Sequence, residues 1–220
     1  MSAKEAQHAV YGHWSATLQM LKNMALYLLG LPLRLIAPRS TRVTLGNALV
    51  APLRLGLKKR GVPLWLNSPA KDLLVEDGRV VGAFVERAGK RVTVRAKKGV
   101  LLASGGFEHN PLLRQQHLPH PTSTDWSAAN KHNTGDALAM TAPLQPALRL
   151  LDDAWWSPAA LVPGSAPAHA LVFEKSMPHG LFVNGRGERF TNESAPYIDV
   201  VNGMYANHTE EHRAVPCWMI

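Results

Sequence analysis

The stretch Gly99-Val100-Leu101-Leu102-Ala103-Ser104-Gly105-Gly106-Phe107-Glu108-His109 decides the fold of this chain. Its apolar run, residues 100–103, is typical of a strand covered on both faces in a parallel sheet. Two adjacent glycines follow, and without a Cβ they let a flat or phosphorylated group approach the backbone. Ligands of open α/β sheets bind at this carboxyl edge of the strands. A strand that ends in a tight turn is the alternative interpretation.

The composition is that of a chain with a hydrophobic core. Its 220 residues are 46% hydrophobic and 18% charged, enough for one large domain or two small ones. The single cysteine, Cys217, excludes a disulfide scaffold and a cysteine-based zinc site, and it is compatible with a reducing compartment. Because residues 1–11 are polar, we expect no secretory signal and a cytoplasmic location.

The net charge of +8 is concentrated in the first third of the chain, where nine Lys or Arg and no Asp or Glu occur between residues 6 and 71. Such a stretch can face nucleic acid, membrane phosphates or a polyanionic cofactor. No helix-turn-helix, zinc-finger or RNA-recognition signature is present, so we expect no nucleic-acid partner. A solvated basic face is the simplest interpretation.

Two helices are expected in this basic part. Residues 24–33 are almost wholly apolar, but a membrane crossing needs about 20 such residues. We therefore expect a helix packed in a core and interrupted at Gly30, with peripheral membrane contact as the alternative. A second helix is expected from Thr44, with Asn47 as its N-cap, and Pro52 should either kink this helix or delay its start.

A β-meander is expected next, after a short buried strand at residues 64–66. Residues 72–76 and 79–85 flank Asp77-Gly78, a strong hairpin signal. Alternating apolar and polar residues over 91–96 predict a third strand with one buried face, before the chain returns to the main sheet.

Prolines become frequent after residue 142, and we place a domain change between residues 140 and 150. A hairpin is expected around the turn at residues 184–187, and residues 216–220 have the pattern of a starting strand. Trp155 and Trp156 stand side by side and can either line an apolar pocket or pack in the core.

Five stretches, in this order, resemble one group of enzymes: residues 44–50, 104–107, 133–136 (Asn-Thr-Gly-Asp), 187–193 (Gly-Glu-Arg-Phe-Thr-Asn-Glu) and 195–197 (Ala-Pro-Tyr). Together they are similar to the FAD-dependent oxidoreductases that include fumarate reductases and 3-ketosteroid Δ1-dehydrogenases, with the ketosteroid dehydrogenase branch as the nearer one.

The resemblance implies an α/β fold. We expect a helical segment over residues 1–40 and a partial, Rossmann-like FAD-binding domain with a β-meander over residues 41–142. Part of an α+β substrate or cap domain would follow over residues 143–220.

The resemblance is incomplete, because members of the group begin with a βαβ unit that carries Gly-x-Gly-x-x-Gly. The backbone of that motif holds the cofactor pyrophosphate at a helix N-terminus, and this sequence has no such motif. We therefore expect an internal piece of a flavoenzyme, with a complementary chain as a possible source of the missing parts. A non-catalytic remnant or assembly subunit that binds no flavin alone is the alternative.

The resemblance also implies FAD as the cofactor and a set of residues that line it. Residues 46–48 would begin a helix, whose unpaired N–H groups favour negative charge. Ala70 would border the adenine, and Asp136 would lie near the ribityl and phosphate region unless it only begins a helix. The full set of cofactor-binding candidates is Gly46, Asn47, Ala48, Ala70, Ala103, Ser104, Gly105, Gly106 and Asp136.

Tyr197 is the candidate catalytic residue, since Pro196-Tyr197 matches a pair that contributes to the site of the steroid dehydrogenases. Desaturation next to a ketone develops enolate charge, which hydroxyl donors stabilise, and a tyrosine can act as acid or base. The implied activity is 1,2-desaturation of a small hydrophobic, steroid-like ketone. A structural tyrosine is the alternative.

Arg189 and Glu193 lie in a stretch that fumarate reductases share, so reduction of an unsaturated acid is an alternative function. A dicarboxylate calls for guanidinium clamps, and no arginine follows until Arg213. We therefore favour a keto substrate, and a structural ion pair or turn for Arg189 and Glu193. His208 and His212 have metal-like spacing, but Thr209 stands where the zinc motif has glutamate, so we expect no metal.

Overall fold

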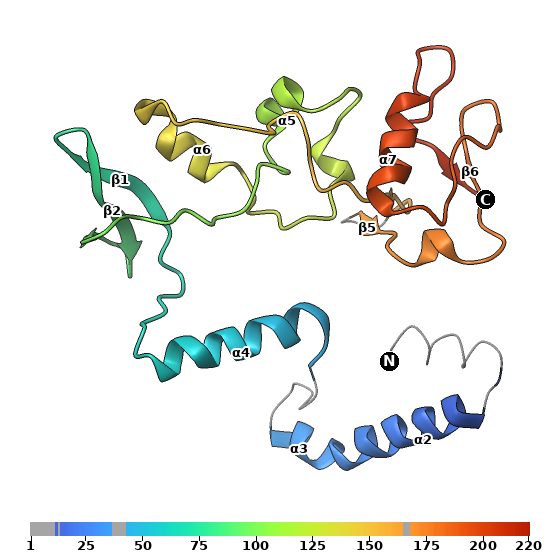
Figure 1. The fold of residues 1–220 in the computed structure, drawn as a ribbon, viewed down its shortest axis with the longest axis horizontal. Coiled ribbons are helices and arrows are strands. Elements are labelled where there is room, and N and C mark those ends of the chain that lie inside the picture. The colour runs from blue at the N-terminus through green and yellow to red at the C-terminus, as the bar shows by residue number, and fades with distance from the viewer. Residues whose placement is uncertain (1–11, 13, 37–42, 165–167) are drawn as a thin grey trace. The chain divides into compact units, whose positions relative to one another are not determined.

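A computed structural model describes residues 12, 14–36, 43–164 and 168–220 (Figure 1). The chain divides into two compact units, an N-terminal unit (residues 1–66) and a C-terminal unit (residues 67–220). Residues 1–11, on which the expectation of no secretory signal depends, lie outside the described residues.

The N-terminal unit contains α2 (Trp14–Leu29), α3 (Leu31–Ile36) and α4 (Leu45–Lys59). The expected break at Gly30 is confirmed, because α2 and α3 are separate helices on either side of it. The expected core packing is wrong, since Ala16 is the buried residue of α2 and Leu29 is 74% exposed. Within this unit α2 contacts α3, which at 6 residues is too short to cover much of the apolar surface of α2. No helix in the described residues is long and apolar enough to cross a bilayer.

The predicted start of α4 needs a correction. Thr44 is the N-cap residue in an extended conformation, its side chain makes no capping bond, and Asn47 lies inside the first turn. Pro52 is accommodated inside the helix. The short buried strand predicted at residues 64–66 is also wrong: these residues form no strand, and Leu66 is 73% exposed.

The C-terminal unit begins with the predicted β-meander, which is confirmed. Strands β1 (Ala70–Glu76), β2 (Arg79–Arg87) and β3 (Lys90–Arg95) form an antiparallel sheet in sequence order. Leu73 is buried opposite Ala83, while β3 exposes most of its residues. The Asp77-Gly78 turn joins the first two strands because both residues adopt the positive φ that a tight hairpin requires.

The strand predicted at residues 100–104 is absent, although its sequence is apolar. Among the described residues the segment has no ladder partner, and Leu101 is 91% exposed. A strand needs a neighbour to pair with its backbone, and the described strands pair among themselves. The predicted return to a main sheet is therefore wrong for the described residues.

The rest of the C-terminal unit consists of short elements around a small core. Val200 of α7 (Tyr197–Ala206) is fully buried, and Phe182 and Val215 are also buried. β6 (Phe182–Val183; labelled in Figure 1) pairs antiparallel with β7 (Trp218–Met219), so the expected strand near the end of the chain is confirmed. Val183 also bridges Arg189, which confirms the expected hairpin. The elements are α5 (Pro111–His117), η1 (Thr124–Trp126), α6 (Asp136–Thr141), η2 (Ala142–Leu144), β4 (Ala159–Ala160), β5 (His169–Ala170), η3 (Glu174–Ser176), β6 (Phe182–Val183), α7 (Tyr197–Ala206) and β7 (Trp218–Met219).

Candidate cofactor and substrate site

The glycine pair of the opening motif lies against the segment that leads into α6. The Gly135 N–H donates to the Gly106 carbonyl at 3.0 Å, and the His109 N–H donates to the Asn133 carbonyl at 2.9 Å. Gly105 has a φ of +88°, and a Cβ at this position would meet Asn133 Oδ1 at 2.5 Å. The structure therefore brings residues 105–106 together with residues 133–136, two stretches that the sequence analysis singled out separately.

Gly135 sets the start of α6. It is buried with a φ of +85°, and a Cβ there would meet Leu113 Cδ1 at 2.6 Å, so glycine is required for both conformation and space. Asp136 is the first residue of α6, exposed, and it accepts a hydrogen bond from Thr134 Oγ1 at 2.6 Å. Asp136 thus begins a helix, as one interpretation predicted, while its role toward a cofactor stays a prediction.

Residues 103–106 offer an open surface of small side chains. All four are exposed. Among the described residues, no acceptor pairs with the N–H groups of residues 101–106. Free amide donors beside glycines suit a flat, anionic group. These features are compatible with one side of a dinucleotide such as FAD, and the cofactor role of residues 103–106 remains a prediction. The sequence contains no Gly-x-Gly-x-x-Gly loop for the pyrophosphate.

The other cofactor candidates lie on α4 and β1. Residues 46–48 are exposed in the first turn of α4 and belong to the N-terminal unit. Ala70 begins β1, is exposed and pairs with Val85. Since α6 packs against β1, Ala70 and Asp136 lie on contacting elements. The cofactor roles of residues 46–48 and Ala70 remain predictions.

Tyr197 begins α7, and its hydroxyl oxygen accepts a hydrogen bond of 2.8 Å from the indole Nε1–H of Trp155. Trp155 is 82% exposed, so of the two interpretations of the tryptophan pair, core packing is wrong for this residue. The fully buried Val200 anchors α7, the helix that Tyr197 begins. The structure thus presents a half-buried phenol and an exposed indole as one hydrogen-bonded pair.

A second set of contacts connects the glycine segment with α7. α5 follows the glycines, and its buried Arg114 donates from Nε to Thr122 Oγ1 at 3.0 Å. Pro121, the residue directly before Thr122, lies in the same loop, and its carbonyl accepts a hydrogen bond of 3.2 Å from the Tyr205 hydroxyl on α7. Burial lowers the pKa of Arg114 and raises the pKa of Tyr205. Trp156 packs on Tyr205 with ring centroids 5.4 Å apart.

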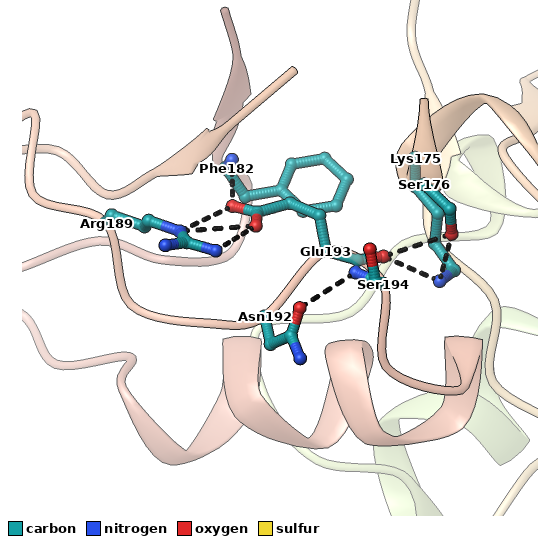
Figure 2. A network of polar contacts seen from close by, with 7 residues as sticks. All are labelled: Lys175, Ser176, Phe182, Arg189, Asn192, Glu193 and Ser194. Atoms are coloured by element: carbon teal, nitrogen blue, oxygen red, sulfur yellow. Dashed lines mark hydrogen bonds and ion pairs between the residues drawn. The ribbon is translucent and has the colours of Figure 1, made fainter. Parts of the chain in front are cut away.

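The turn that precedes Tyr197 is held by a buried carboxylate (Figure 2). Glu193 is 5% exposed and accepts from the Phe182 N–H at 2.9 Å and from Arg189 NH2 at 2.7 Å. The hydrogen bonds from Arg189 are the main cause that lowers the pKa of Glu193 to about 2. The structural ion pair expected from the sequence is confirmed.

Sequence reasoning missed Lys175, which is 2% exposed and donates to the carbonyls of Glu193 and Ala195 (the first of these bonds is drawn in Figure 2). A single lysine in a proline-rich segment carries no signal of burial. His208 has a structural contact, because its Nδ1 accepts from the Val215 N–H at 3.0 Å. Over the described ranges, no three His, Cys, Asp or Glu residues gather as a metal site would require.

The chain matches a known protein family over most of its length. The FAD binding domain family matches residues 12–220. The 3-oxosteroid 1-dehydrogenase of Mycolicibacterium smegmatis is 42% identical over 188 residues, which cover 81% of this chain and 32% of that protein. A 4-oxocyclohex-2-ene-1-carboxylate 5-dehydrogenase of Sinomonas cyclohexanicum is 33% identical, with 80% of this chain and 30% of that protein covered.

A solved structure is similar over the whole chain. It is the 3-ketosteroid Δ1-dehydrogenase of Sterolibacterium denitrificans in complex with 1,4-androstadiene-3,17-dione, with a TM-score of 0.90 and 41% identity over 100% of this chain and 40% of that one. The chain therefore spans about a third of the length of the curated relatives it matches.

The chain belongs to the FAD binding domain family. Within that family, its similarity is to 3-ketosteroid dehydrogenases. These findings confirm the expected fold class, the FAD-dependent oxidoreductase family and FAD as the cofactor the family implies.

Proposed function

We propose that this chain forms part of a FAD-dependent dehydrogenase that introduces a C1–C2 double bond into a 3-ketosteroid. The observation that carries the proposal is the Trp155–Tyr197 pair, which presents a phenol beside an exposed aromatic ring in the same unit as the open glycine segment. The similarity to steroid dehydrogenases, one of them solved with a steroid dione, supports the choice of substrate.

The pair is suited to proton chemistry next to a ketone. An indole N–H can only donate, so the Tyr197 oxygen is the acceptor of the 2.8 Å bond. The hydroxyl hydrogen of Tyr197 can therefore be donated to another acceptor, such as a substrate oxygen. If the phenol is ionised, its oxygen still accepts the hydrogen bond from the indole. Trp155 therefore holds the Tyr197 oxygen in one place whether that oxygen gives or takes a proton.

The cofactor and other residues of the chain would supply what the reaction needs besides Tyr197. When bound, the flavin supplies the redox chemistry by accepting a hydride from the substrate. The exposed residues 103–106 would lie along the cofactor, and Asp136 would lie near its ribityl and phosphate region. The exposed indole of Trp155 gives a flat apolar substrate a surface to contact.

The alternative of an unsaturated dicarboxylic acid is less compatible with the site. A dicarboxylate needs free guanidinium groups, and the guanidinium of Arg189 is already paired with Glu193. The buried Arg114 makes its bonds inside the protein, to Thr122 and the Glu108 carbonyl.

A spectroscopic experiment tests the proposal. The purified chain is mixed with FAD, freed of excess cofactor and titrated without oxygen with 4-androstene-3,17-dione while the visible flavin band is recorded. We expect bleaching with the wild-type chain, about a hundredfold slower bleaching with Tyr197→Phe, and wild-type behaviour with Tyr205→Phe on the same helix. Bound flavin that the steroid does not bleach, or equal rates for wild type and Tyr197→Phe, would contradict it. Titration with 4-oxocyclohexanecarboxylate separates a steroid substrate from a small cyclic keto acid.

A further inference from the structure

The side chain of Lys175 in η3 is almost completely buried, with 2% of its surface exposed, beside the turn that leads into α7. Its ammonium has three hydrogens and three acceptors. They are Ser176 Oγ at 3.2 Å, the Glu193 carbonyl at 2.8 Å and the Ala195 carbonyl at 2.5 Å. Every donor of this cation is therefore used inside the protein.

No carboxylate of the described residues forms an ion pair with Lys175. The nearby carboxylate of Glu193 faces the other side of the turn, toward Arg189 and the Phe182 N–H (Figure 2). Burying a cation with only neutral partners is costly, and an apolar side chain of the same length would fill the space at a lower cost. Packing alone does not account for a lysine here.

The acceptors show what the ammonium holds. Ala195 is followed directly by Pro196 and Tyr197, so the bond to the Ala195 carbonyl lies two residues before the phenol. The bond to the Glu193 carbonyl, reinforced by Ser176 Oγ at 3.3 Å, holds the preceding part of the turn. Both carbonyls belong to the turn that leads into α7.

We propose that Lys175 is a positioning residue, which holds the turn at residues 193–195 so that the Tyr197 hydroxyl meets the Trp155 indole. The inference rests on the proposed role of Tyr197, but its geometric part concerns the Trp155–Tyr197 bond alone. It can therefore be measured without flavin or steroid.

The readout is the indole N–H of Trp155, seen by NMR in the ¹⁵N-labelled full chain and assigned with Trp155→Phe. Lys175→Met keeps the length of the side chain and removes the ammonium. We expect the indole N–H of Trp155 to exchange with solvent about fivefold faster than in the wild type and to match Tyr197→Phe. Lys71→Met, the same change at an exposed lysine paired with Glu86, is the control and should leave this signal unchanged.

Backbone amides of β1 and β2 separate positioning from general stability. If Lys175 positions Tyr197, Lys175→Met changes the exchange of these backbone amides far less than the exchange of the Trp155 indole N–H. Lys175→Arg keeps the charge and the donors, so it should retain part of the indole protection that Lys175→Met loses. An unchanged indole signal in Lys175→Met, or a loss of protection equal throughout the chain, would overturn the proposal.

A second variant covers the case in which Lys175→Met does not fold. Ser176→Ala removes one acceptor of the ammonium and one donor to the Glu193 carbonyl while the charge stays. We expect a smaller acceleration of exchange at the same indole N–H, and a wild-type signal would overturn the proposal. Either result is independent of steroid oxidation, so a failure here and a failure of the proposed function remain distinguishable.

Discussion

Replacing Glu193 with glutamine removes the negative charge from a turn that the structure holds tightly. The change keeps the shape of the side chain and an oxygen that can accept from the Phe182 N–H. It removes the ion pair with Arg189, whose nearest atoms are 2.7 Å apart. We expect Glu193→Gln to fold and to be less stable than the wild type at neutral pH.

The size of the effect follows from the pKa of Glu193. The lowering of this pKa from the ordinary value of 4.5 to about 2 sets an upper limit of about 3.5 kcal/mol, since each pKa unit is worth about 1.4 kcal/mol. Glu193 is buried, but Arg189 is 53% exposed, so solvent weakens the attraction. We therefore expect a loss of about 1–2 kcal/mol in the free energy of unfolding.

The effect has a defined pH dependence. A carboxylate whose folded pKa is lowered stabilises the fold above its unfolded pKa, and this stabilisation is lost as the pH falls. For Glu193 the loss occurs between pH 4.5 and about 2, where the unfolded chain binds the proton first. The difference between wild type and Glu193→Gln should therefore be constant above this range and shrink within it.

Urea denaturation across this pH range measures the difference. Glu76→Gln, which breaks the exposed pair with Arg95 on the meander, is the matched control and should have a smaller effect. Equal stability of Glu193→Gln and wild type at neutral pH would refute the reasoning, as would a difference that stays the same down to about pH 2.

Three further substitutions have expected outcomes. Gly135→Ala should cost about 2–4 kcal/mol in urea denaturation, because alanine is strained at a φ of +85° and its Cβ would meet Leu113 Cδ1 at 2.6 Å; a loss under 1 kcal/mol would contradict this. Val200→Ala should cost about 2 kcal/mol by the same assay, since Val200 is fully buried, and a neutral result would show that this core is not closely packed. Trp155→Phe should lower kcat for steroid oxidation about fivefold with a small change in KM, because it removes the donor to Tyr197; an unchanged kcat would argue against the pair.

Local patterns in this sequence predicted local structure well. The β-meander could be predicted because Asp77-Gly78 and the alternation around it specify a hairpin within a few residues. The break between α2 and α3 was also readable, since Gly30 interrupts the apolar run. Each of these signals depends on neighbours in the sequence alone.

Features that depend on distant residues could not be predicted in the same way. The apolar residues 100–103 have the composition of a buried strand, but composition does not show whether another strand lies alongside. The Trp155–Tyr197 bond joins residues 42 positions apart, and Lys175 meets Glu193 and Ala195 across 18 and 20 positions. No spacing rule connects such residues, so only the folded chain shows that they meet.

The most direct test of the proposed function places this chain in a complete flavoenzyme. The aligned part of the chain replaces its counterpart in the 3-oxosteroid 1-dehydrogenase of Mycolicibacterium smegmatis, with which it is 42% identical, and steroid oxidation is measured after the visible flavin band has verified cofactor binding. We expect the flavin-loaded chimera to oxidise 4-androstene-3,17-dione and to lose at least about a hundredfold in kcat with Tyr197→Phe. A flavin-loaded chimera that is inactive, or one that works equally well with Tyr197→Phe, would contradict the account.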